Sequence, residues 1–161
     1  MAAISTDAWT RRRAGGALLG LLGTPVLAAA NPQALKPVVE VWKSPTCGCC
    51  KVWVEHIEAN GFTVKVHEVG NTAVRARLGI PAKLGSCHTA QLGGYAIEGH
   101  VPAREMHRLL KYKPTAVGLA VPGMPIGSPG MDGPEYGPRR DPYDVLLVRK
   151  DGSSVPYQTY R

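Results

Sequence analysis

The chain has 161 residues, 44% of them hydrophobic, and its 19 Lys and Arg side chains outnumber 12 Asp and Glu, which gives a formal net charge of +7. This length is typical of one domain with its own hydrophobic core and excludes a large multidomain enzyme. A core of this size is stable without cross-links, so the four cysteines are not needed as staples. The 19 glycines and 14 prolines predict a loop-rich fold rather than a helical bundle.

Residues 1–30 have the pattern of a signal peptide. Arginines 11–13 precede an apolar stretch that ends in the small residues 28–30, and cleavage is expected before Asn31. The apolar stretch is shorter than the roughly 20 residues of a membrane span, so no span is expected after cleavage. A general secretory signal is favoured over a twin-arginine signal. The alternative, a buried N-terminal helix, is disfavoured because four glycines within the stretch would weaken it.

The charge of the mature chain is modest. Removal of the three arginines and Asp7 lowers the net charge from +7 to +5. The remaining cations are scattered, and aromatic residues are not interleaved with them as in a base-stacking surface. The sequence therefore predicts no nucleic-acid partner.

After a short linker, residues 31–37, the chain alternates between strand and helix patterns. Alternating β-branched residues predict strands, and apolar residues at helical spacing predict helices. In chain order we expect a strand at 38–42, a helix at 49–60, a strand at 62–69, a helix at 73–78, a hairpin of strands 86–92 and 95–101, and a helix at 103–112. This order predicts an α/β fold, specifically a thioredoxin-like sandwich.

Residues 113–142 interrupt the regular pattern. Gly and Pro recur throughout this segment, which carries Met124 and Met131, and irregular loops of this length in a compact domain are commonly functional. A second hairpin is expected after it, with strands at 143–149 and 154–160. We therefore expect a single metal-binding domain, residues 38–161, whose sandwich is extended by a C-terminal Gly/Pro/Met loop and β-hairpin.

Three cysteines, Cys47, Cys49 and Cys50, lie where the first strand gives way to the first helix. Unpaired backbone N–H groups and the positive end of the helix dipole stabilise a thiolate at such a position. The thiolate serves either as a redox nucleophile or as a ligand for a soft metal. Cys47 and Cys50 also have the C-x-x-C spacing of a thiol–disulfide exchanger, and an inert structural disulfide between them is a further alternative.

Cys87 is expected to face these three cysteines. In a thioredoxin-like arrangement, the start of the strand after the second helix lies opposite the C-x-x-C turn, where redox members keep a cis-proline. Here that position holds Ser86-Cys87-His88. Four converging thiolates suit a metal centre better than a disulfide exchanger, although Cys87 could instead be a small buried core residue.

Three further side chains, Met124, Met131 and His88, are candidates to complete or shield the site. Thioethers on a loop suit Cu(I), because soft sulfur ligands select monovalent copper, although either methionine could instead pack against the core. His88 adjoins Cys87 in sequence, but strand alternation would direct the two side chains to opposite faces. His56 and His107 are expected to be solvated.

The mature chain, from about Val38 to Thr159, resembles a family of exported bacterial proteins from copper-resistance gene clusters known as CopG. The matching segments are residues 43–50, 86–90, 94–102 and 118–131, which include the motif Cys47-Gly48-Cys49-Cys50. The resemblance implies a periplasmic, thioredoxin-like protein that binds several copper ions in a cysteine-bridged cluster. It also implies a role in copper redox handling.

We therefore predict a periplasmic copper-binding protein in which the four cysteines bridge Cu(I) ions. Bridging is expected because four thiolates exceed the coordination that one Cu(I) prefers. Sequestration and a copper oxidoreductase activity both fit these residues, and the expected partners are copper ions and another periplasmic cuproprotein. The alternative is a thiol–disulfide oxidoreductase in which Cys47 attacks and Cys50 resolves. Export disfavours an iron–sulfur cluster, and the crowded Cys49-Cys50 pair disfavours zinc.

Overall fold

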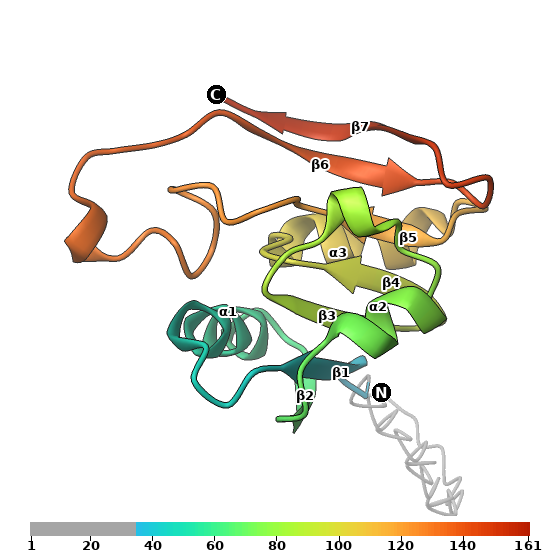
Figure 1. Cartoon of the computed structure of the whole chain (residues 1–161), viewed down its shortest axis with the longest axis horizontal. Helices are drawn as coiled ribbons and strands as arrows, with labels where there is room; N and C mark the ends of the chain where they lie inside the picture. The colour runs from blue at the N-terminus through green and yellow to red at the C-terminus, as the bar shows by residue number, and fades with distance from the viewer. Residues whose placement is uncertain (1–34) are drawn as a thin grey trace, which may run out of the picture. The chain divides into compact units, whose positions relative to one another are not determined.

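The structure, a computed structural model, describes residues 35–161. These residues form a mixed α/β unit built on one seven-stranded sheet (Figure 1). In chain order the elements are β1 (Val38–Lys43), α1 (Gly48–Ala59), β2 (Thr63–His67), α2 (Thr72–Arg77), the 3₁₀ helix η1 (Ala82–Leu84), β3 (His88–Leu92), β4 (Tyr95–Glu98), α3 (Ala103–Tyr112), β5 (Gly118–Ala120), the 3₁₀ helix η2 (Pro134–Tyr136), β6 (Tyr143–Val148) and β7 (Ser154–Tyr160). The expected signal peptide, residues 1–30, and most of the expected linker lie outside the described residues.

The sheet has the strand order β2-β1-β3-β4-β5-β6-β7. β1 pairs in parallel with β2 and antiparallel with β3, and Lys43 at the end of β1 is opposite His88 at the start of β3. The turn that follows β1 and the residue that precedes β3 therefore lie at the same end of the sheet. The C-terminal hairpin β6–β7 forms the edge opposite β2 (Figure 1).

Helices α1 and α3 bury their apolar side chains in the main core. Trp53 and Ile57 of α1 and Met106 and Leu109 of α3 are completely buried together with side chains from the sheet. Each large side chain buried in this way contributes roughly 1.5–3 kcal/mol relative to exposure. Because Trp53 lies one helical turn after Cys49 and Cys50, core packing holds the cysteine-bearing end of α1 against the sheet.

A second, smaller core packs against sheet residues that do not belong to the main core. Ile80 and Leu84, which follow α2, pack with Ala96 of β4, Ala120 of β5 and Val148 of β6. Their sheet neighbours Ile97 and Leu119 belong to the main core, as expected when successive side chains of a strand point to opposite faces. Both faces of the central strands are therefore covered.

The expected α/β class and the order of its elements are confirmed, with boundaries that differ by at most a few residues. The prediction of a wholly irregular segment at 113–142 is wrong, because it contains β5 and η2. β5 has only three residues, which is too short for an alternation pattern, and it is held by pairing with β4 on one side and β6 on the other. Tertiary pairing rather than local propensity decides this strand.

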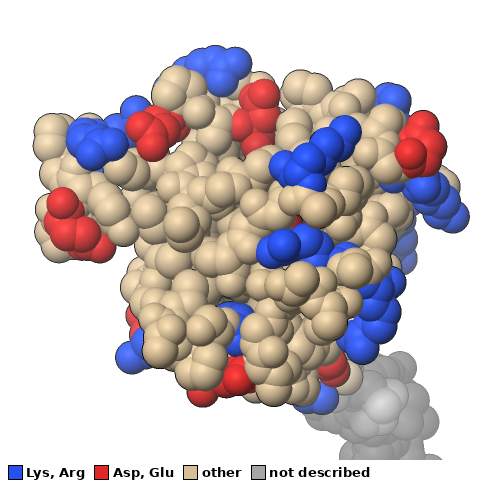
Figure 2. Space-filling model, viewed as in Figure 1, with Lys and Arg blue, Asp and Glu red and all other residues tan. Residues whose placement is uncertain are grey.

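Charged side chains of both signs occur on the surface. On the face shown in Figure 2, Asp and Glu are interspersed among Lys and Arg. Among residues 35–161, no helix has the length and apolar character needed to cross a membrane.

A glycine in the short strand β5 is expected to be essential for stability. A methyl group at Gly118 would overlap the backbone of Ala96, the residue paired with it on β4. We expect Gly118→Ala to lower the free energy of unfolding by on the order of 3 kcal/mol in a urea titration. Gly48→Ala is the control, because a methyl group there meets no atom within 4 Å, and it should leave stability unchanged or slightly higher. Equal stability of the two variants would contradict this interpretation.

Candidate metal centre

The N-terminal end of α1 carries three of the four cysteines. The turn that leads into α1 is closed by the N–H of Cys47, which donates to the carbonyl of Ser44 at 3.2 Å. Cys47 is the N-cap residue, with no capping side-chain hydrogen bond, and the first turn of the helix contains no acidic residue. The partial positive charge at this helix end is therefore available to stabilise a thiolate.

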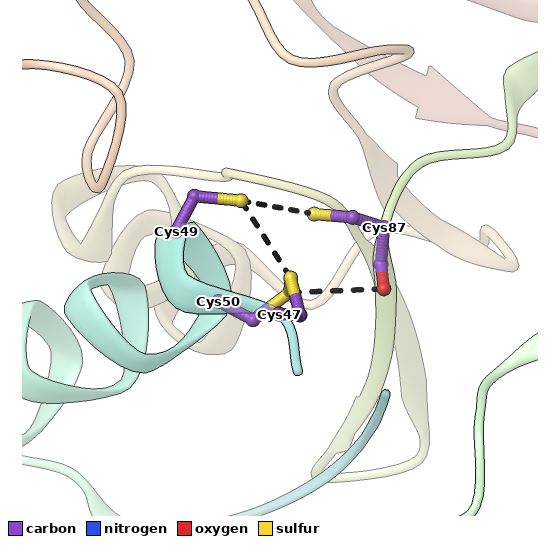
Figure 3. Close-up of side chains that lie close together, drawn as sticks. All are labelled: Cys47, Cys49, Cys50 and Cys87. Carbon is purple, nitrogen blue, oxygen red and sulfur yellow. Dashed lines mark hydrogen bonds between the residues drawn. A yellow bond between two sulfur atoms is a disulfide. The ribbon is translucent and has the colours of Figure 1, made fainter. Parts of the chain in front are cut away.

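The four sulfur atoms form one cluster, and Cys87 lies opposite the other three as expected. Figure 3 shows the Cys49 and Cys87 sulfurs pointing toward each other, with the Cys47–Cys50 pair beside them. The Sγ atom of Cys49 lies 3.6 Å from that of Cys47 and 3.8 Å from that of Cys87. All four sulfurs lie within 4.8 Å of one another, a separation that allows them to share metal ions.

Cys47 and Cys50 are joined by a disulfide, whereas Cys49 and Cys87 are free thiols. The disulfide was the alternative to four free thiols in the sequence analysis. Thiolates rather than disulfides are metal ligands, so the form with four sulfur ligands requires two-electron reduction of this bond.

The free thiol of Cys87 is protonated at neutral pH in the metal-free protein. Burial raises its pKa to about 12, and the neighbouring Cys49 sulfur acts in the same direction. A metal ion that binds Cys87 must therefore displace this proton, and binding is expected to release it.

Two buried histidines also contact the Cys87 sulfur. The Nδ1 atom of His88 lies 3.5 Å and the Nε2 atom of His100 lies 3.4 Å from this sulfur, and both side chains are fully buried. Strand alternation predicts that His88 and Cys87 point to opposite faces, yet the His88 Nδ1 atom approaches the sulfur from the first position of β3. The Nε2 atom of His88 has no hydrogen-bond partner within the described part of the chain. Cys87, His88 and His100 together form a second set of donor atoms that lie within 4.8 Å of one another.

Both imidazoles are held in the neutral form. Burial lowers the pKa of His88 well below its usual value, with His100 acting in the same direction. Burial also lowers the pKa of His100 to about 4, although the Asp132 carboxylate opposes the shift. The Ser128 hydroxyl donates to the Pro125 carbonyl and lies 3.5 Å from His100 Nδ1. It is thereby placed to accept the Nδ1 proton, which leaves the Nε2 lone pair directed at Cys87.

His100 is a site residue that was not among the predicted ligands, although the sequence contains a signal for it. The predicted hairpin has a two-residue turn at Gly93-Gly94, and its register pairs Leu92 with Tyr95 and Thr89 with Glu98. Continuing that register by two residues brings Cys87 opposite His100. Antiparallel pairing, rather than proximity in sequence, therefore identifies this histidine.

The two loop methionines occupy different environments. The thioether sulfur of Met124 lies 3.9 Å from Cys49 Sγ, and its side chain is 51% exposed at the solvent side of the cluster. The sulfur of Met131 instead accepts a hydrogen bond from the Tyr136 hydroxyl at 3.4 Å. The structure thus brings Met124, but not Met131, into contact with a cysteine sulfur.

The two histidines that were expected to be solvated differ from each other. His107 is exposed, as expected. His56 is half-buried, and its Nε2 atom accepts a hydrogen bond from the Ala103 N–H at 3.2 Å. The expectation for His56 is therefore wrong, because α1 and the start of α3 pack together.

A buried ionic network holds the segment next to Cys87. Glu98 is fully buried, and its carboxylate accepts hydrogen bonds from the Ser86 N–H at 2.7 Å, from Arg75 Nε at 2.9 Å and from the Thr89 hydroxyl at 2.5 Å. The guanidinium of Arg75 also donates to the Ser86 carbonyl at 2.5 Å. The Ser86 hydroxyl donates to the carbonyl of Gly123, the residue before Met124. Glu98 and Arg75 therefore position both Cys87 and the Met124 loop.

Two solved structures are similar to this chain in both fold and sequence. These structures, "Copper resistance protein copG- Form 2" and "Copper resistance protein copG- Form 1", match with TM-scores of 0.71 and 0.70. Their sequence identities to the chain are 43% and 44%, and the alignments cover 78% and 76% of this chain and 98% and 96% of the matched chains.

The chain belongs to the CopG copper-resistance family. The family description "Protein of unknown function, DUF411" matches residues 84–131, a segment that contains Cys87, both buried histidines and both loop methionines. None of the curated proteins matches the chain. The donor set of this CopG member, thiols, imidazoles and a thioether, is soft, and it fits copper better than a hard cation such as Mg²⁺.

The Glu98 network is expected to control the cysteine cluster. We expect Glu98→Gln to weaken Cu(I) binding by about 10–100-fold in competition with a chelator, because Ser86 and hence Cys87 lose their anchor. It should also change the alkylation rate of Cys87, which peptide mass mapping measures.

The matched control is Glu105→Gln. Glu105 is equally buried and is bonded to Arg108 and Tyr160 rather than to the cysteine region. This variant should lose stability but keep its Cu(I) affinity. Equal loss of affinity in both variants would show that Glu98 acts only through global stability.

The buried neutral histidines predict a pH dependence of the metal-free protein. Because His100 binds its proton at a pH of about 4 when folded and at about 6.5 when unfolded, the unfolded state takes up more protons between these values. The contribution of neutral His100 to the free energy of unfolding is fully present above pH 6.5 and is lost as the pH falls to 4. Its upper limit is on the order of 3 kcal/mol. Urea unfolding over this range should show a shallower pH dependence for His100→Gln than for the parent protein. Parallel curves would contradict the assignment.

Proposed function

We propose that this protein binds copper in the periplasm through a multinuclear site bridged by Cys47, Cys49, Cys50 and Cys87. The observation that carries the proposal is the convergence of all four sulfurs within 4.8 Å. One Cu(I) ion does not use four thiolates, whereas sulfurs this close can each serve two ions. The CopG titles of the similar structures support copper as the metal.

Imidazole and thioether groups surround the sulfurs in this proposal. His88 and His100 offer neutral nitrogens on the protein side of Cys87, and Met124 covers the solvent side of Cys49. Met131 belongs to the same loop, and we assign it the role of holding that loop through Tyr136 in preference to direct ligation.

The cysteine pair also supports a redox role. In the reduced protein Cys47 and Cys50 form a dithiol. This dithiol can give one electron to each of two Cu(II) ions, which yields two Cu(I) ions, one disulfide and two protons. The Cys47–Cys50 disulfide is the form of the pair that such a reaction would leave. The Cu(I) formed would be transferred to another periplasmic cuproprotein, or sequestered by all four sulfurs once the disulfide is reduced again. Either outcome would contribute to copper resistance.

The fold and the location are part of the same proposal. The strand–cysteine turn–helix unit, the core helices α1 and α3, and the opposing strand at Cys87 support a thioredoxin-like sandwich extended by the loop and the β6–β7 hairpin. Export through a signal peptide at residues 1–30 would place the protein in the periplasm, where copper is handled outside the cytosol.

Thiol–disulfide oxidoreductase activity is the second candidate, and the Cys47–Cys50 disulfide is the observation that favours it. This activity would need neither Cys87 nor copper. Insulin reduction that survives in Cys87→Ser would support it, and its absence in the parent protein would exclude it.

Copper titration of the reduced protein tests the main proposal. We expect about two or more Cu(I) ions per chain by native mass spectrometry, because shared sulfurs hold more than one ion. Cys87→Ser should lower this number, and a fully reduced parent protein that binds no Cu(I) would contradict the proposal.

The loop methionines provide a matched pair of variants. Met124→Leu should weaken Cu(I) binding by about tenfold, since it removes a thioether beside Cys49 while keeping the side-chain volume. Met131→Leu makes the same chemical change beside Tyr136 and should have a smaller effect in the same chelator competition. A larger effect at Met131 would reverse our assignment of the two roles.

A further inference from the structure

A cavity of about 480 Å³ opens beside the disulfide. Pro45, Val54 and Val66 contribute apolar walls, and the Cys47 end of the disulfide forms part of the lining. Cavities of this volume accept small organic molecules. Cys49, Cys87 and Met124 are not among the described residues that line it, so the cavity reaches the cysteine cluster from the Cys47 side and not from the Met124 side.

Only one end of the disulfide is open to attack. Cys50 is completely buried, whereas Cys47 is half-buried and lines the cavity. A thiolate that reduces a disulfide attacks one sulfur in line with the bond and expels the other. A molecule in the cavity therefore reaches Cys47 Sγ, and Cys50 becomes the leaving thiolate.

The cavity carries a net positive charge. Lys43 and Lys51 line it together with one carboxylate, Glu68, which is bonded to Lys43 at 2.9 Å. Lys51 keeps most of its charge available, because its Glu55 partner is 4.0 Å away and both side chains are exposed. The end of α1 beside the cavity adds to the positive potential. An anionic molecule is favoured in this field and a cationic one is disfavoured.

We propose that this cavity binds a small anionic thiol that reduces the Cys47–Cys50 disulfide. The first thiolate forms a mixed disulfide with Cys47 and releases Cys50 as a thiolate, which takes up a proton. A second thiol molecule then attacks the sulfur of the first, which releases Cys47 and a low-molecular-weight disulfide. In total one protein disulfide and two thiols give one protein dithiol and one small disulfide.

This inference rests on the proposed function, since reduction would regenerate the dithiol that donates electrons to Cu(II). It also assigns the two reactants to different surfaces. The thiol would enter at Lys51 and Cys47, whereas copper would enter beside Met124 and Cys49.

A series of thiols of different charge tests the proposal on the metal-free protein with its disulfide intact. The probes are mercaptoethanesulfonate, 2-mercaptoethanol and cysteamine, in which the group at the far end from the thiol is respectively anionic, neutral and cationic. Reduction is followed by acid quenching, alkylation and mass spectrometry, and rates are divided by the thiolate concentration. At low ionic strength we expect the anionic thiol to react about tenfold faster than the cationic one, and high salt should narrow this ratio.

Two variants with the same change of net charge locate the effect. Lys51→Glu places a negative charge at the cavity and should abolish or reverse the preference for the anionic thiol. Lys111→Glu makes the same change on α3, outside the cavity lining, and should leave the preference unchanged. Equal rates for all three thiols, or equal behaviour of the two variants, would overturn the proposal. Because no copper is present in the assay, that result would leave the copper-binding proposal standing.

Discussion

The antiparallel pairing of β1 with β3 is the constraint on which the candidate site depends. It sets Lys43 opposite His88, so the turn that follows β1 and the segment that precedes β3 meet at one end of the sheet. Cys47, Cys49 and Cys50 then face Cys87, although Cys87 follows Cys50 by 37 positions in the chain. Continuation of the β3–β4 pairing adds His100 from a third segment.

Burial gives these donors their chemistry. Desolvation keeps the Cys87 thiol protonated and the two imidazoles neutral in the absence of metal, because each charged form would lose its hydration. In the same low-dielectric surroundings, burial of the Glu98 carboxylate costs free energy unless its oxygens are fully hydrogen-bonded. Burial raises the pKa of Glu98, although hydrogen bonds from Thr89, Ser86 and Arg75 oppose the shift. The fold thus combines an uncharged donor cluster with a charged anchor directly behind it.

Local sequence signals were sufficient for the regular elements and for part of the site. The strand, the cysteine turn and the helix were readable because Val38–Trp42, Pro45 and the spacing of Trp53 and Ile57 each carry a distinct signal. The three-residue strand β5 and the half-buried His56 were not predictable in this way. Each depends on neighbours distant in the chain, and neither leaves a periodic pattern.

The sequence by itself determined that three cysteines crowd the start of a helix and that a Gly/Pro loop carries two thioethers. It predicted that Cys87 faces the three cysteines only through the expected fold. The tertiary structure alone decided which thioether reaches a sulfur, that His100 joins Cys87, that Cys47 and Cys50 are bonded, and that Cys47 opens onto a cationic cavity. The physical reason is that residue type and spacing record local geometry and donor chemistry. Burial, partner choice and cavity shape arise only when separate segments pack against one another.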